Sequence, residues 1–128
     1  AVGFGWGGGL HNRMALAAGS RLDAGVVFYG PSPTPAEAAT VKAKMMFHYA
    51  GLDDRVNATA PDWIAALKKA GVSVQSYTYP NVNHAFHNDT SAARYDAPAA
   101  RLAWDRSIAF FSATLKVPKV EKTALPKD

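Results

Sequence analysis

The alternation of short apolar runs with segments of helical pattern constrains the fold of this chain most. Each apolar run is followed by a glycine or a proline, the residues that most often interrupt strands and helices. The runs expected as strands are residues 1–4, 25–29, 45–50 and 72–79. The segments expected as helices are residues 11–18, 37–42, 61–71 and 97–115. Strands that alternate with helices predict an α/β fold, with a mostly parallel sheet and helices on both faces.

The last expected helix carries large apolar side chains at the spacing i, i+4, i+7 and i+11. These residues are Trp104, Ile108, Phe111 and Leu115. Because this spacing places them on one face of a helix, we expect the stripe to pack on the sheet.

Composition excludes several classes of protein and of site. The chain has 128 residues, 48% of them hydrophobic, which predicts one folded domain. It has no cysteine, which excludes disulfides, thiolate metal ligands and a cysteine nucleophile. It has no apolar run of the roughly 18 residues or more that a membrane span needs. No charged leader precedes an apolar core, and this favours a cytoplasmic location.

The net charge of +4 is unevenly distributed. The segment 116–128 holds four lysines against two carboxylates, and so carries half of it. We therefore divide the chain into a domain at 1–116 and a basic, proline-containing tail at 117–128. Elsewhere the basic residues are scattered, without the concentrated patch that nucleic-acid binding requires. Nucleic acid is not expected as a partner.

The stretch GFGWGGG, residues 3–9, follows the first expected strand and has the outline of a nucleophile elbow. Such a turn needs small residues two before and two after the nucleophile, and Gly3 and Gly7 meet that need. The nucleophile position is occupied by Gly5, which has no side chain. Glycine relieves the backbone strain of such a turn and removes the reactive atom. The backbone N–H of Trp6 is expected to serve an oxyanion hole.

Two further features follow expected strands. Asp53 and Asp54 come after the run 45–50, and His84 comes after the run 72–79. Because the carboxyl ends of parallel strands meet at one edge of a sheet, we expect these side chains to lie near Gly5. Nucleophile position, acid and histidine follow each other in the order of α/β-hydrolases. In such a triad the histidine takes the nucleophile's proton and the acid holds the imidazole.

The glycine turn also permits a different interpretation, a loop that cradles phosphate. Gly3, Gly5 and Gly8 fit a dinucleotide fingerprint, with Asp23 as its acidic residue. That residue should end the second strand, however, and Asp23 precedes it. A nucleotide-binding α/β domain remains an alternative.

Three other histidines have simpler interpretations. We expect His48, inside an apolar run, to be packed in the core. His11 and His87 are expected to flank a site, but neither has the i, i+4 histidine partner of a zinc helix. No metal site is predicted.

Beyond these patterns, the sequence resembles the dienelactone hydrolase family. VGFGWGGG, residues 2–9, is similar to that family's elbow, usually V-G-F-C-x-G-G. The resemblance extends to YAGLDDRVNA, residues 49–58, which is similar to the segment with the triad acid, and to YPNVNHAFHNDTSAARYD, residues 79–96, which is similar to the histidine segment. Residues 99–111 resemble the closing helix. The likeness covers residues 1 to about 115.

The resemblance implies an α/β-hydrolase fold and hydrolysis of carboxylic esters or lactones by a nucleophile–His–acid triad, without a cofactor. It assigns the base to His84 and the acid to Asp54, three residues after Gly51, with Asp53 as the fallback. It assigns the oxyanion-hole N–H to Trp6, and the partner is a small ester or lactone.

The departures from the family pattern set limits on this function. Gly5 stands where the family has cysteine, which implies an impaired form. Asn88 stands where the dienelactone enzyme has an arginine that grips the substrate's carboxylate, and Arg94 is nearby but not equivalent; the substrate is therefore unknown. The resemblance begins at the elbow, so the chain corresponds to the second half of the fold. A non-catalytic binding or assembly module is the alternative, joined to a separate N-terminal half or to itself as a homo-oligomer.

Overall fold

The computed structural model describes residues 1–115 of the chain. The basic tail expected at residues 117–128 lies outside the described residues.

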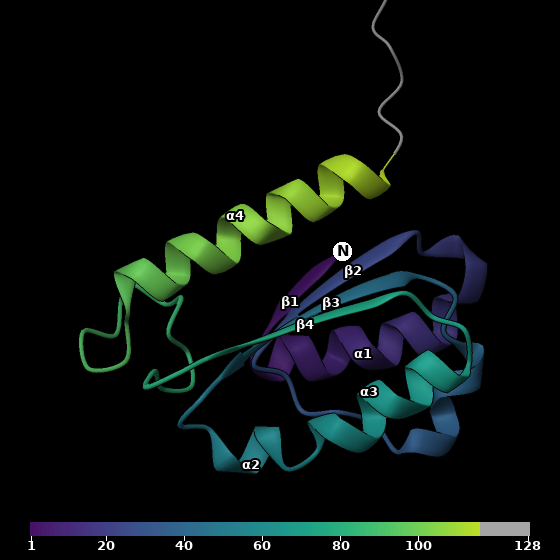
Figure 1. Ribbon diagram of the computed structural model, residues 1–128, viewed down its shortest axis with the longest axis horizontal. Coiled ribbons are helices and arrows are strands. Elements are labelled where there is room, and N and C mark those ends of the chain that lie inside the picture. Colours follow the sequence, from purple (N-terminus) through teal and green to yellow (C-terminus); the bar gives the residue numbers. More distant parts are fainter. Residues whose placement is uncertain (116–128) are drawn as a thin grey trace, which may run out of the picture.

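Four parallel strands form a single sheet in the order β1-β2-β3-β4 (Figure 1). They are β1 (Val2–Phe4), β2 (Ala24–Phe28), β3 (Lys44–Ala50) and β4 (Val74–Tyr79). The register aligns Phe4 with Phe28 and Phe28 with His48. The parallel sheet of the expected α/β fold is therefore confirmed.

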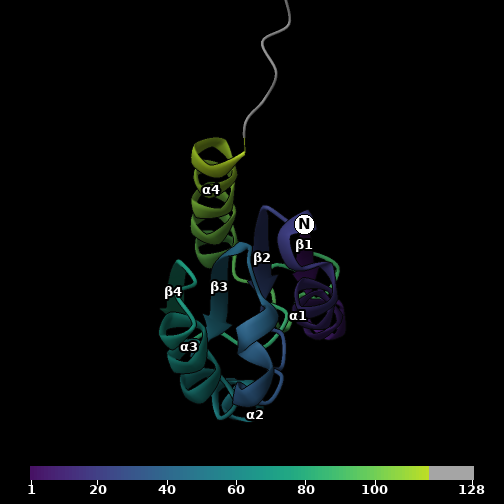
Figure 2. The ribbon, with the colours of Figure 1, turned by 90° about the vertical axis from the view of Figure 1, so that its right-hand side faces the viewer.

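Helices cover both faces of this sheet (Figure 2). They are α1 (Trp6–Ala18), α2 (Asp54–Asn57), α3 (Ala60–Lys69) and α4 (Ala97–Thr114), with 3₁₀ turns at Gly19–Arg21 and Pro35–Thr40. α1 and α3 pack on one face, where Trp63 and Leu67 are fully buried, and α4 packs on the other. None of the helices within residues 1–115 is long and apolar enough to cross a membrane.

α1 begins at Trp6, five residues earlier than the sequence predicts. Residues 7–9 are glycines, which have low helix propensity, so the sequence pattern predicts that the helix starts at His11. The helix forms through them because its first residues are fixed by the turn after β1. The N–H of Gly9 donates to the carbonyl of Gly5 at 3.0 Å.

The expected packing of α4 is wrong. The face of α4 that contacts the sheet is made of small residues and one aromatic side chain: Ala99, Ala100, Ala103, Ser107 and Phe110. Trp104, Ile108 and Leu115 are exposed, and Phe111 is only half-buried. Small side chains allow the helix to approach the sheet closely, and Ser107 meets a polar partner there.

That partner is His48, which is fully buried in β3, as the sequence predicts. Its Nε2 lies 2.9 Å from the Ser107 hydroxyl, and its Nδ1 lies 2.9 Å from the Tyr79 hydroxyl. Ser107 donates its own proton to the carbonyl of Ala103 at 2.7 Å, so it accepts from Nε2–H. Nδ1 therefore accepts from Tyr79. Burial, and then the nearby positive charge of Arg106, lower the pKa of His48 to about 3.

Candidate active site

The turn between β1 and α1 consists of Gly5 alone. Its φ of 54° and ψ of −122° lie in a region that side-chain-bearing residues rarely adopt. The N–H of Gly5 donates to the carbonyl of Phe28 at 2.9 Å, which ties the turn to the end of β2. The sharp strand-to-helix turn of a nucleophile elbow is therefore present.

The two glycines that flank this position differ in what surrounds them. A Cβ on Gly3 would lie 2.4 Å from the carbonyl oxygen of Gly7 and 2.8 Å from the Cβ of His11, which no side chain tolerates. A Cβ on Gly7 would meet nothing within 4 Å besides its chain neighbours and the backbone of its own helix. Of these two glycines only Gly3 is required by the turn within residues 1–115, contrary to the expectation for Gly7.

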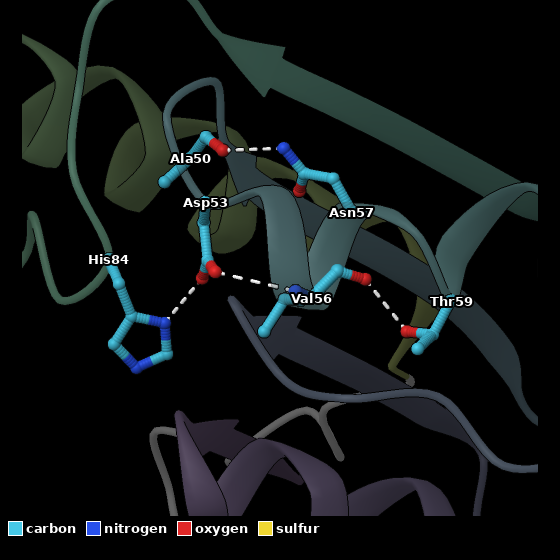
Figure 3. Close-up of polar contacts among 6 residues, drawn as sticks. All are labelled: Ala50, Asp53, Val56, Asn57, Thr59 and His84. Carbon is cyan, nitrogen blue, oxygen red and sulfur yellow. Dashed lines mark hydrogen bonds and ion pairs between the residues drawn. The ribbon is translucent and has the colours of Figure 1, made fainter.

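His84 contacts a carboxylate that follows β3 (Figure 3). Its Nδ1 lies 2.5 Å from Oδ2 of Asp53. The other oxygen of Asp53 accepts from the N–H of Val56 at 3.3 Å, because Asp53 precedes α2 and caps it. Only 9% of Asp53 is exposed. A buried carboxylate held at both oxygens fixes the orientation of the imidazole.

The acid that the family resemblance assigns, Asp54, is not the carboxylate that contacts His84. Asp54 is the first residue of α2 and is exposed to solvent. The N–H of Asp53 donates to the carbonyl of Ala50 at 3.1 Å, closing a tight turn after β3. This turn directs Asp53 inward, and the first turn of α2 carries Asp54 outward. The fallback, Asp53, is the carboxylate that contacts His84.

The imidazole of His84 points its other nitrogen toward the elbow. A Cβ built on Gly5 would lie 3.5 Å from Nε2 of His84. Because a carboxylate only accepts hydrogen bonds, Nδ1 carries the ring proton and Nε2 is left with its lone pair facing this position. Gly5, His84 and Asp53 therefore lie next to one another, with the imidazole between the glycine and the carboxylate.

Trp6 contributes only its backbone to this arrangement. It is the first residue of α1, and the N–H groups of a first helical turn have no intrahelical partner. They also lie at the positive end of the helix dipole, which favours negative charge. The indole ring of Trp6 is 82% exposed. The N–H of Trp6 thus follows Gly5 directly in the chain, and its role as an oxyanion donor stays a prediction.

A cavity of about 580 Å³ opens at this point. It is lined by Phe4, Gly5, Tyr29, His84, Ala85, His87, Asn88 and Asp89. His87 lies in its wall as expected, between the rings of Phe4 at 5.3 Å and Trp104 at 5.5 Å. Burial lowers the pKa of His87, and Asp89 opposes this. Asn88 lies in the wall, whereas Arg94 does not line the cavity.

The other sequence candidates lie away from the cavity. His11 is buried, and a Cβ on Gly25 would lie 2.4 Å from its ring, so it packs against β2. Asp23 lies immediately before β2, at the end of the sheet opposite the glycine turn. Within residues 1–115, no group of three or more His, Asp or Glu side chains is placed to hold a metal ion.

Tyr29 is a site residue that the sequence analysis missed. It directly follows β2, has a φ of 38°, and its ring lies 5.0 Å from the ring of His84. Burial raises the pKa of Tyr29 to about 12, so its hydroxyl is neutral at ordinary pH. The rule that sites form at the carboxyl ends of parallel strands would have found it.

Comparison with known proteins gives a consistent picture. A model of the "Dienelactone hydrolase family" matches residues 1–115. A protein of Saccharolobus solfataricus named "Putative carboxymethylenebutenolidase" is 39% identical over 111 residues, which cover 86% of this chain and 42% of that protein. "Protein usf" of Aquifex pyrophilus is 37% identical over 112 residues, covering 86% and 48%. The chain spans about half the length of the curated relatives it matches.

Solved structures with a similar fold include members and relatives of the same family. The crystal structure of a "Putative Dienelactone Hydrolase" from Klebsiella pneumoniae has a TM-score of 0.77 at 28% identity, covering 87% of this chain and 50% of that one. The dienelactone hydrolase-like promiscuous phosphotriesterase P91, from metagenomic libraries, has a TM-score of 0.80 at 23% identity, covering 89% and 51%. At that identity the second likeness shows the fold alone.

Proposed function

Because the chain belongs to the dienelactone hydrolase family, we propose that its site serves the hydrolysis of carboxylic esters or lactones, with water in place of the missing nucleophile side chain. The observation that carries this proposal is the His84–Asp53 pair, whose free nitrogen faces the Gly5 position. A base oriented by a buried acid, beside unpaired N–H groups of a helix, is the arrangement that acyl transfer requires.

The proposed reaction begins with a water molecule in the space left by the missing side chain. Nε2 of His84 takes one proton from it, and the oxygen attacks the carbonyl carbon of the ester. The negative charge on the resulting tetrahedral intermediate is stabilised by the N–H of Trp6. The intermediate collapses as the carbon–oxygen bond to the alcohol breaks. The imidazolium returns its proton to the departing alkoxide, leaving a carboxylic acid and an alcohol.

This reaction is expected to be slow. Removing the nucleophile of a triad leaves about 10³–10⁴-fold catalysis over water from the oxyanion hole and binding alone. The chain spans about half of the length of its relatives. The substrate stays undefined within the class of small esters and lactones. A cytoplasmic location stays a proposal, which fractionation of cells with an antibody against the chain would test.

The sharpest test restores the missing atom. Gly5→Cys introduces the only thiol of the chain, so alkylation can be followed by intact mass without labelling at other cysteines. We expect this thiol to react with iodoacetamide faster than a free thiol at pH 6.5, because a histidine at this distance activates the thiolate. A rate equal to that of a free thiol would contradict the proposed site.

Adjacent carboxylates provide a matched control. In the Gly5→Cys background, Asp53→Asn should slow alkylation, because the imidazole loses the group that orients it. Asp54→Asn changes the neighbouring, exposed carboxylate and should leave the rate unchanged. Equal effects of the two substitutions would show that the pairing is not functional.

The backbone at Gly5 is unfavourable for a side chain, so Gly5→Cys should lose about 1–3 kcal/mol of stability.

A second test of the proposed hydrolysis keeps the glycine at position 5. In the chain with glycine, His84→Ala should abolish slow hydrolysis of p-nitrophenyl acetate. An unchanged rate would mean that hydrolysis does not use this histidine.

A further inference from the structure

A groove runs between α4 and the strands β3 and β4, toward the amino ends of these strands and away from the cavity beside Gly5. Its volume is about 370 Å³. Figure 2 shows α4 above the two strands. We call this surface the α4–β4 groove, and the residues that matter for its chemistry are Lys44, Met46, Gln75, Tyr77, Arg106 and Phe110.

The middle of the α4–β4 groove is apolar. Met46 of β3 lies on its floor and is 2% exposed, and Phe110 of α4 lies in its wall and is 7% exposed. Ala109 and Ala113 line the same wall, four residues apart on one face of the helix. Because these side chains carry no polar atom, the middle of the groove offers contact only to apolar parts of a ligand.

Arg106 is fixed at one end of the groove. Its guanidinium carbon lies 4.0 Å from the ring centre of Tyr77, and its Nη1 donates to the hydroxyl of Tyr79 at 3.2 Å. A guanidinium has five N–H donors, so others remain for a ligand. Within residues 1–115 Arg106 forms no ion pair. A planar guanidinium held in this way is preorganised to bind a carboxylate.

A second cation, Lys44, lies at the other end of the groove. It is the first residue of β3, is exposed, and lines the groove. Tyr77, against which Arg106 stacks, aligns with His48, four residues after Lys44 in β3. At roughly 3.3 Å per residue the two charges lie about 13 Å apart along the strands. No Asp or Glu among the described residues lines the groove, so its charge is positive at both ends.

We propose that the α4–β4 groove binds a linear aliphatic dicarboxylate, with one carboxylate on Arg106, the other on Lys44, and the methylene chain between them along Met46 and Phe110. A cation at each end favours an acid group at each end, and the buried apolar middle favours methylene groups. A monocarboxylate of equal length would place its apolar end against Lys44, and a small inorganic anion would leave the apolar middle without contact. Decanedioate, extended, is close in length to the separation of the two charges.

The experiment titrates the 128-residue chain with decanedioate in a calorimeter, at about 0.15 M salt, where exposed charges are screened. We expect saturable binding of one decanedioate per chain. Butanedioate is too short to reach both cations, and decanoate has a single acid group. Each of them should bind about 10-fold more weakly or worse, because each loses one charge-assisted hydrogen bond.

Two lysines provide a matched pair of variants. Lys44→Gln should weaken the binding of decanedioate about 10-fold and make it no tighter than that of decanoate. Lys42→Gln should leave the affinity unchanged, since Lys42 is equally exposed, lies two residues earlier and does not line the groove. Arg106→Gln should weaken binding at least as much as Lys44→Gln. Should loss of the stacking on Tyr77 prevent that variant from folding, the exposed lysines decide the matter.

Three results would overturn the proposal: no saturable binding of decanedioate, equal affinity for decanedioate and for butanedioate or decanoate, or equal weakening by Lys44→Gln and Lys42→Gln. The groove lies away from Gly5 and His84, and the titration contains no ester. Failure of the chain to hydrolyse esters would therefore leave this binding site standing, and absence of binding would leave the proposed hydrolysis standing.

Discussion

The buried histidine beneath α4 predicts that the described fold loses stability in mild acid. His48 is fully buried, donates through Nε2–H to Ser107 and accepts at Nδ1 from Tyr79, so its neutral form is bonded at both nitrogens. Protonation would place an uncompensated charge beside Arg106. Lowering the pH from 7 to 5 is therefore the perturbation.

The magnitude follows from the difference between the folded and unfolded states. The pKa of His48 is about 6.5 in the unfolded chain and about 3 in the folded one. Between these values only the unfolded state takes up the proton, so the free energy of unfolding falls as the pH falls from about 6.5 toward 3. At about 1.4 kcal/mol per pH unit below 6.5, His48 lowers the free energy of unfolding by about 2 kcal/mol at pH 5.

Urea unfolding at pH 7 and pH 5, followed by the fluorescence of the buried Trp63, measures this loss. Other groups titrate in the same range, since burial also lowers the pKa of His11 and of His87. The comparison is therefore with His48→Phe, in which the pH 7 to pH 5 difference should shrink by about 2 kcal/mol. The reasoning is refuted if that variant loses as much stability on acidification as the chain with histidine.

Further substitutions test individual contacts, each by urea unfolding at pH 7. Gly3→Ala should destabilise the chain by about 2 kcal/mol or more, because its Cβ would lie 2.4 Å from a backbone oxygen. Gly7→Ala would meet only the backbone of its own helix, so it should be neutral or mildly stabilising. Ser107→Ala should cost about 1–3 kcal/mol, since the buried Nε2–H of His48 loses its acceptor. Asp96→Ala should cost about 1 kcal/mol, because its carboxylate caps α4 at the N–H of Ala99. A Gly7→Ala loss as large as that of Gly3→Ala, or no loss at Ser107 or Asp96, would contradict the corresponding contact.

The element order and the sheet were predictable because strands and helices leave different periodicities in the sequence. Every expected strand is present, with bounds that differ by at most two residues. The packing of α4 was not predictable in the same way. Periodicity identified the face of the helix with the largest apolar residues. The face that packs on the sheet carries Ala100, Ala103 and Ser107, whose small size permits close approach. The sequence pattern alone does not predict which of two apolar faces of a helix packs on the sheet.

For the candidate site, the rule that sites form at the carboxyl ends of parallel strands predicted which segments lie close together. It did not predict which of the adjacent residues Asp53 and Asp54 contacts His84. The family resemblance assigns Asp54, three residues after Gly51, but the turn that closes on Ala50 directs Asp53 toward His84. A shift of one residue at the start of a helix changes which of two neighbouring carboxylates is buried. No periodic pattern in the sequence predicts that choice. Tyr29 was missed because it is the residue just past a strand, where an aromatic side chain looks like an extension of the core.

The glycine at the elbow has a consequence for how such a chain is detected. Fluorophosphonate and related electrophilic probes form a lasting bond with a catalytic serine or cysteine, and Gly5 offers them no atom to capture. A proteome survey based on such probes would pass over this chain although its His84–Asp53 pair is in place. Reversible ligands would still encounter the imidazole and the space beside it, so screens by equilibrium binding are the ones able to register this site.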